Sequence, residues 1–240
     1  MADGFEVVGD DFNIVVNATW VNYELWYKNS VTLDERNQAQ FGAYAFNGSI
    51  FEVPQESGLA FISCSDPFVI MEGGWRNGKR LIGVSVEYHG QAVPIVTLYI
   101  FRKQAPVGST SGVQLFDKQG ILVFDGSSKF AKIATIVKPE EGVGKFALPS
   151  GRQYAVMLPQ FAGSAVTHVR EGYGSGLGGN RYTIIKQLYG HRFLCESDGV
   201  TLMSKYHRFA IAEFPSWTAP AGSSFSYSGG GFVVADVTGY

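Results

Sequence analysis

The sequence predicts a nearly all-β protein, with two tandem antiparallel β-sandwich domains followed by an extra C-terminal strand. Three observations support this prediction. Aromatic residues make up 14% of the chain and glycine occurs 30 times, which is typical of β-structure with many turns. Apolar runs recur about every 8–12 residues, with Gly, Pro or Asn-Gly between them. No long stretch combines a helical apolar period with caps at both ends.

The segment Gly112–Asp125 (GVQLFDKQGILVFD) is predicted to form a tight β-hairpin. Its apolar runs Val113–Phe116 and Ile121–Asp125 flank a polar turn that ends in glycine, the residue best able to adopt a positive φ. Gly4–Asn17 (GFEVVGDDFNIVVN) repeats the pattern, and Gly231–Tyr240 (GFVVADVTGY) repeats its first strand and turn. These repeats indicate an internally duplicated architecture.

The linkers between the repeats suggest where the domains divide. An Ala-Pro-x-Gly-Ser sequence precedes both the second and the third copy, at Ala105–Ser109 and Ala219–Ser223. We therefore expect a first sandwich over residues 1–103 and a second over residues 112–215, with the same topology. Residues 216–240 would form a linker and the extra strand.

Residues 1–103 contain six further candidate strands, chosen for β-branched and aromatic content between turn residues. They are Trp20–Val31, Ala43–Val53, Leu59–Cys64, Phe68–Met71, Leu81–His89 and Ile95–Phe101. Asn47-Gly48 is a strong hairpin turn within the second of them. Only Thr32–Ala39 is polar enough to suggest a short helical turn.

The second half gives eight candidate strands by the same criteria. They are Phe130–Val137, Lys145–Leu148, Gln153–Leu158, Ala165–Arg170, Tyr182–Tyr189, Arg192–Glu196, Val200–Ser204 and Tyr206–Phe214. Asp198-Gly199 supplies a hairpin turn between two of them.

Composition excludes several classes of protein. Only 17% of residues are charged and the net charge is −2, so we expect neither a nucleic acid nor an anionic membrane as partner. No apolar run reaches the roughly 18 residues of a membrane helix, so no membrane insertion is expected. The first residues lack the pattern of a signal peptide. Cys64 and Cys195, one in each expected domain, predict no disulfide framework and favour folding in the cytosol.

No motif with a catalytic mechanism is recognisable, so we expect no enzyme activity, no cofactor and no metal site. Gly174–Gly179 matches G-x-G-x-x-G, but a strand is expected after it, which favours a flexible loop over a dinucleotide site. The four histidines stand alone in the sequence. Acidic pairs such as Asp10-Asp11 are interpreted as solvated turn residues, with calcium binding as the alternative. A glycan hydrolase remains a third functional hypothesis, without a nominated set of residues.

Several aromatic and apolar residues are candidates for binding a partner. Trp75 and Trp217 lie in Gly- or Pro-flanked connections, and Tyr173 and Tyr182 flank the Gly-rich loop. Trp20 and Trp26, in a strand, are instead expected in the core.

The C-terminal segment Ser224–Tyr240 is too apolar to hang free in water, with Phe232, Val234 and Tyr240 among its apolar residues. Its unpaired backbone groups would need a partner, so we expect it to pair with a neighbouring subunit in an oligomer. The alternative is pairing with its own second domain. On the first hypothesis, deletion of Phe232–Tyr240 would leave both domains folded but prevent assembly.

The hairpin Gly112–Asp125, with the pattern G-V-Q-L-F-D-x-x-G-x-L-V-F-D, resembles the opening hairpin of many small tail and tail-tip proteins of tailed bacteriophages. The resemblance implies a structural virion protein, folded in the host cytoplasm, which assembles with other phage tail proteins and with copies of itself. On this hypothesis the protein also contributes to attachment to a host-surface glycan or protein. The alternative is a carbohydrate-binding β-sandwich module that recognises host-surface glycans, with Trp75, Tyr173 and the Gly-rich loop as its site.

Overall fold

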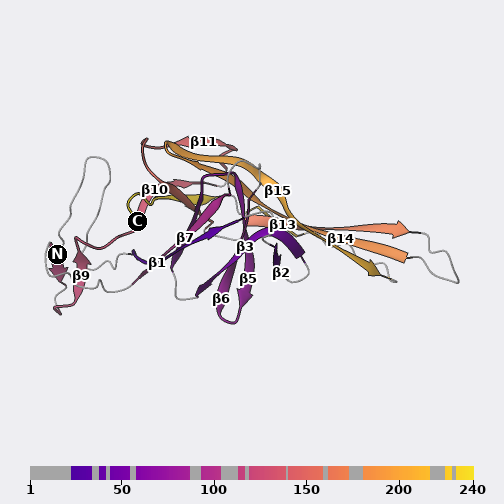
Figure 1. Ribbon diagram of the computed structural model, residues 1–240, viewed down its shortest axis with the longest axis horizontal. Helices are drawn as coiled ribbons and strands as arrows, with labels where there is room; N and C mark the ends of the chain where they lie inside the picture. Colours follow the sequence, from indigo (N-terminus) through magenta and orange to yellow (C-terminus); the bar gives the residue numbers. More distant parts are fainter. Residues whose placement is uncertain are drawn as a thin grey trace.

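The computed structural model confirms an all-β protein (Figure 1). It describes residues 23–33, 38–41, 44–54, 58–86, 93–103, 113–116, 119–138, 140–158, 162–172, 181–216, 225–228 and 231–240. The strands are β1 (Tyr23–Thr32), β2 (Gln38–Phe41), β3 (Tyr44–Pro54), β4 (Leu59–Cys64), β5 (Phe68–Arg76), β6 (Lys79–Val86), β7 (Ile95–Lys103), β8 (Gln114–Phe116), β9 (Leu122–Asp125), β10 (Lys132–Val137), β11 (Gly144–Ala147), β12 (Tyr154–Met157), β13 (Ala162–Gly172), β14 (Arg181–Glu196), β15 (Gly199–Ser216), β16 (Phe225–Ser228) and β17 (Phe232–Asp236). The hairpin Gly4–Asn17 lies outside the described residues.

The six-stranded sheet has the order β1-β7-β4-β12-β17-β10, and its two outer strands meet at one end. Glu24 of β1 forms a bridge with Phe130, just before β10. Beside it, the Leu25 N–H donates to the Lys129 carbonyl at 2.7 Å. The sheet therefore curls until its edges join, which satisfies backbone groups that an open edge would expose.

The inner strands of this sheet are apolar on both faces. On β4, Ile62 faces the large core between the sheets, whereas Phe61 faces a second cluster on the opposite side. Successive side chains of a strand point to opposite faces, so burial on both faces requires a continuous apolar run. The second cluster comprises Phe61, Tyr99, Phe101, Ala155, Met157, Val233, Ala235 and Val237. The curled sheet therefore has a core of its own.

The nine-stranded sheet is organised by the long hairpin of β14 and β15. Near its turn, β14 pairs with β5 and β15 pairs with β11. Further along, β14 pairs with β13, and β15 touches β3 at the single pair Ile211↔Ala45. Figure 1 shows the far parts of β13, β14 and β15 extending as a three-stranded arm away from the body.

The two halves of the chain share both large sheets, which corrects the expected division at residues 103–112. In the six-stranded sheet, β4 from the first half pairs with β12 from the second through Ile62↔Val156. In the other sheet, β3, β5 and β6 lie between β15 and β14. Two separate sandwiches would keep their strands in separate sheets. The described strands instead enclose one core between the two sheets.

The C-terminal strand β17 pairs within its own chain, which corrects the expectation of an intersubunit strand. It lies between β10 and β12, antiparallel to both. All five of its residues are buried, and both ladders satisfy its backbone groups. The alternative prediction, pairing with the second half of its own chain, is confirmed.

A buried carboxylate fixes the end of this strand. The side chain of Asp236 is fully buried, and Arg152 Nη1 lies 2.7 Å from its Oδ2. The Thr238 N–H donates to its Oδ1 at 2.9 Å. Burial alone would raise the pKa of Asp236, but hydrogen bonds from Thr238 and Arg152 outweigh burial and lower it.

Replacing Asp236 by alanine is expected to lower the free energy of unfolding by about 2–3 kcal/mol, because buried donors lose their acceptor. The folded-state pKa of Asp236 is lowered, so its contribution is present above the unfolded-state pKa and is lost as the pH falls through the folded-state pKa. Urea unfolding at neutral and acid pH should therefore show the largest loss at neutral pH. Glu140→Ala, at an exposed turn, is the control and should change stability by less than about 0.5 kcal/mol. An equal loss at both pH values would contradict this role for the ionised carboxylate.

Candidate partner-binding surfaces

The predicted hairpin at Gly112–Asp125 forms as β8 and β9, a separate two-stranded sheet. Gly120 in its turn has a φ of 77°, as the sequence indicated. A polar clasp closes the base of the hairpin around Asp125, which is fully buried. Gln114 Nε2 donates to its Oδ2 at 2.9 Å, and Ser127 N and Oγ donate to its Oδ1 at 2.8 and 2.6 Å. Gln114 and Asp125 of the motif therefore have a structural role.

The same hairpin exposes apolar side chains. Val113, Phe116 and Ile121 are 62%, 54% and 55% exposed. In Figure 1 the hairpin, labelled at β9, lies at one end of the molecule, and the three-stranded arm lies at the other. Phe124 stacks on Phe130 just before β10, with ring centroids 5.1 Å apart, which links the hairpin to the body. Three exposed apolar side chains therefore lie on a hairpin whose base is anchored.

Trp75 is presented at the end of a second hairpin, formed by β5 and β6. Asn77 and Gly78 both have positive φ, 52° and 72°, as a type I′ turn requires. A bulge between Glu72 and Trp75 precedes the turn. Trp75 is 59% exposed, so its prediction as an accessible tryptophan is consistent with the structure.

Glu52 on the neighbouring strand β3 holds the two sides of this hairpin. Its carboxylate accepts from Lys79 Nζ at 2.9 Å and from Arg76 Nη2 at 2.5 Å. Hydrogen bonds from Lys79 and then Arg76 lower the pKa of Glu52. The exposed indole therefore stands on a hairpin whose two strands are bridged at the surface by Glu52.

Gly78→Ala tests the contribution of the turn in the hairpin that carries Trp75. The φ of 72° disfavours any side chain, although a methyl group there would meet no atom within 4 Å. We expect a loss of about 1 kcal/mol in the free energy of unfolding, from backbone strain alone. Gly142→Ala is the matched control, since a methyl group there also meets no atom and no strained φ is involved. Equal effects of the two substitutions in urea unfolding would contradict this explanation.

Strand β1 also exposes aromatic side chains. The structure therefore corrects the prediction that Trp26 belongs to the core. Trp26 is 39% exposed and Tyr27 is 46% exposed. A register shift between Leu25 and Tyr27 places the two rings side by side, with centroids 6.2 Å apart. The guanidinium of Arg102 lies 4.5 Å from the Trp26 ring centroid. Sequence reasoning missed Tyr27, although two adjacent aromatics on one strand already imply that one of them faces outward.

The predicted C-terminal binding residues belong to the interior instead. Phe232 and Val234 are fully buried between the two large sheets. Tyr240 is partly buried, packs edge-on against Phe101 and donates from its hydroxyl to the Phe130 carbonyl. Lys28 Nζ donates to the Tyr240 carbonyl at 2.6 Å. Burial, with the nearby charge of Asp236, raises the pKa of Tyr240 to about 12. Tyr240 therefore helps to close the curled sheet, whereas Phe232 and Val234 belong to the core between the sheets.

The remaining candidates are Trp217, Tyr173, Tyr182 and the Gly-rich loop. Trp217 and Tyr173 lie outside the described residues. Tyr182 lies in β14, where its backbone pairs with Glu171 and Ser216 in the projecting arm. The Gly-rich loop Gly174–Gly179 is also outside the described residues.

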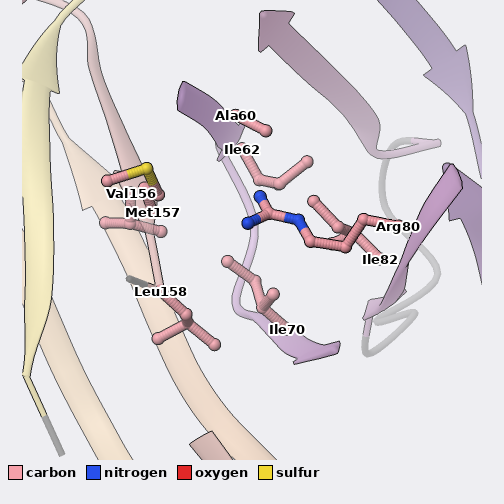
Figure 2. A pocket seen from close by; sticks show the side chains of 8 residues that line it. All are labelled: Ala60, Ile62, Ile70, Arg80, Ile82, Val156, Met157 and Leu158. Atoms are coloured by element: carbon pink, nitrogen blue, oxygen red, sulfur yellow. The ribbon is translucent and has the colours of Figure 1, made fainter. Parts of the chain in front are cut away.

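In the described part of the chain, two of the cavities lie where the strands of the sheets pack together. Figure 2 shows the guanidinium of Arg80 entering one of them, among apolar side chains from both sheets. Its volume of about 10 Å³ suits a single water molecule. The other is an open cleft of about 330 Å³, lined by residues of β4, β7 and β14 and by residues 152–154. Within the described ranges, no three His, Cys, Asp or Glu side chains group in a way that could hold a metal ion.

Comparison of the chain with protein-family models, curated proteins and solved structures finds no match. In the part of the chain that the structure describes, no helix is long and apolar enough to cross a membrane.

Proposed function

We propose that this chain is a structural virion protein of a tailed bacteriophage, a tail or tail-tip component that assembles with other tail proteins and contributes to host attachment. The observation that supports the proposal is the hairpin β8–β9. Its sequence resembles the opening hairpin of phage tail proteins, and it exposes Val113, Phe116 and Ile121 while Asp125 anchors its base. The hairpin would act by burying these side chains against a neighbouring tail protein or another copy of the chain.

The energetics of such a contact are favourable. Full burial of an exposed Val, Ile or Phe side chain contributes about 1.5–3 kcal/mol. Three such residues lie on one hairpin, so their burial against a partner would supply the apolar contribution to the contact. Because the clasp around Asp125 fixes the hairpin before binding, little conformational entropy is lost when a partner covers it.

The first experiment is peptide mass spectrometry of phage particles purified on a density gradient. We expect peptides of this chain to follow the major capsid and tail proteins through the gradient. The protein should also remain with the particles after a high-salt wash, because apolar contacts are not screened by salt. Recovery of the chain only in the soluble lysate, and never with particles, would refute the virion assignment.

A second candidate function is binding of a host-surface carbohydrate, favoured by the exposed indole rings of Trp75 and Trp26. An indole face packs well against the apolar face of a sugar ring. Titration of the protein with neutral oligosaccharides, followed by tryptophan fluorescence, tests this candidate. It predicts saturable quenching that Trp75→Ala or Trp26→Ala abolishes. Unchanged fluorescence at millimolar sugar would exclude it.

A further inference from the structure

The two cysteines of the chain lie on facing sheets. Cys64 is the last residue of β4 in the six-stranded sheet, where it pairs with Val96. Cys195 lies near the end of β14 in the nine-stranded sheet, where it pairs with Val200. Residues far apart in sequence are thus brought to the same end of the sandwich. The sequence had predicted one cysteine in each of two separate domains.

Cys64 and Cys195 also contact one another. Both line the open cleft of about 330 Å³. The backbone N–H of Cys64 is close enough to donate a hydrogen bond to the Cys195 sulfur. Cys64 belongs to the core between the sheets, and Cys195 packs against that core. Both are free thiols in this structure.

We propose that Cys64 and Cys195 are an oxidation site, at which the folded protein forms an intramolecular disulfide when it meets a small disulfide oxidant such as oxidised glutathione. One sulfur attacks the oxidant and forms a mixed disulfide, releasing one reduced thiol. The second cysteine then attacks the first, forms the Cys64–Cys195 bond and releases the other thiol. The two cysteines together lose two protons and two electrons, and the oxidant gains them.

The surroundings of the pair determine how fast it reacts. Burial raises the pKa of Cys64 to about 11 and that of Cys195 to about 12. Very little thiolate is present at neutral pH, so the pair stays reduced in a reducing compartment and oxidises slowly elsewhere. The cleft beside the pair is open to solvent and Cys195 is partly exposed, so a small oxidant meets Cys195 first, whereas Cys64 is buried. A protein made in the cytosol and later exposed outside the cell would acquire this cross-link late.

The bond would tie the two sheets together at this end of the core. It closes a loop on the order of 100 residues, a length for which the loss of unfolded-state entropy is large. We expect the oxidised protein to melt roughly 10 °C above the reduced protein.

The test incubates the folded full-length protein with oxidised glutathione and follows it by intact-mass and peptide mass spectrometry. The expected product has lost the mass of two hydrogens, contains a Cys64–Cys195 linked peptide and no longer reacts with iodoacetamide. Cys64→Ala and Cys195→Ala are the controls. Neither can form the link, and neither should show the rise in melting temperature.

Other outcomes would overturn the proposal. The proposal is wrong if both cysteines still react with iodoacetamide after prolonged oxidation. It is also wrong if each cysteine retains a glutathione, or if the disulfide joins two protein molecules. If an alanine variant fails to fold, the unmodified protein still decides whether the disulfide forms. Reduction with dithiothreitol should then remove the linked peptide and reverse the rise in melting temperature.

Discussion

Deleting Phe232–Tyr240 is expected to unfold the protein. The deletion removes β17 from between β10 and β12, and with it both ladders of backbone hydrogen bonds. Phe232, Val234 and Val237 are fully buried, and each contributes about 1.5–3 kcal/mol through burial alone. The combined loss is comparable with the whole stability of a domain, about 5–15 kcal/mol. Circular dichroism and one-dimensional NMR of the truncated chain should show no cooperative fold.

A point substitution tests whether the truncated chain unfolds because buried side chains are lost or because the chain is shorter. Val234→Asp should also unfold the protein, because it places a carboxylate in the core between the sheets. Ile136→Asp on the adjacent strand β10 is the control, since Ile136 is 67% exposed and should tolerate the change. A truncated chain that stays folded would contradict the intrachain position of β17 and restore the intersubunit hypothesis.

The second large effect is expected in assembly. Replacing Phe116 and Ile121 together by aspartate should weaken association with the partner by at least about 100-fold, because each side chain loses roughly 1.5–3 kcal/mol of burial. The isolated protein should keep its melting temperature, because both residues are more than half exposed. Sedimentation velocity, or reconstitution with tail extracts, measures the association.

Val143→Asp is the matched control for the hairpin variant. Val143 is 60% exposed, but it lies in the turn before β11, outside the hairpin. It should leave association unchanged. If Val143→Asp impairs assembly as strongly as the hairpin variant, general surface hydrophobicity explains the effect and the hairpin is not the docking surface.

Local features of this fold could be predicted from the sequence, whereas strand pairing could not. The strand Leu59–Cys64 was predicted with the bounds that β4 has, and the hairpin turn at Gly120 forms as expected. The β14–β15 hairpin also forms, but its turn residues are Ser197 and Asp198, and Gly199 already pairs with Glu196. The turn predicted at Asn47-Gly48 is wrong, because both residues lie inside the continuous strand β3. Periodicity and turn residues act over a few residues, so they reveal such elements. The pairing of β4 with β12 joins distant segments through Ile62 and Val156. No local pattern distinguishes that partner from others of the same composition.

Gly190 is another position where the local sequence does not reveal a contact with a distant strand. The sequence predicted two strands, ending at Tyr189 and beginning at Arg192, but the structure has the single strand β14 with register shifts there. A Cβ atom on Gly190 would lie 2.5 Å from the carbonyl oxygen of Ile70. The glycine therefore permits close approach of β5 to the backbone of β14 and does not end the strand.

The candidate surfaces were predictable only in part. Trp75 was chosen because it was expected in a Gly-flanked connection; it lies instead in strand β5, just before the turn at Asn77 and Gly78, and is exposed. Trp26 was assigned to the core because a tryptophan on a strand is usually covered. Whether that face of β1 is covered depends on tertiary packing, which the sequence of β1 does not contain. The burial of Phe232 likewise depends on β10 and β12, which lie elsewhere in the chain.

Electron microscopy of phage particles labelled with an antibody against this chain tests the central claim most directly. The account predicts label confined to the tail or its tip. It also predicts that particles assembled with the Phe116 and Ile121 double-aspartate variant carry none, although the variant is produced in normal amounts. Label on the head, or no label on any particle of the unmodified phage, would contradict the assignment of this chain as a tail protein.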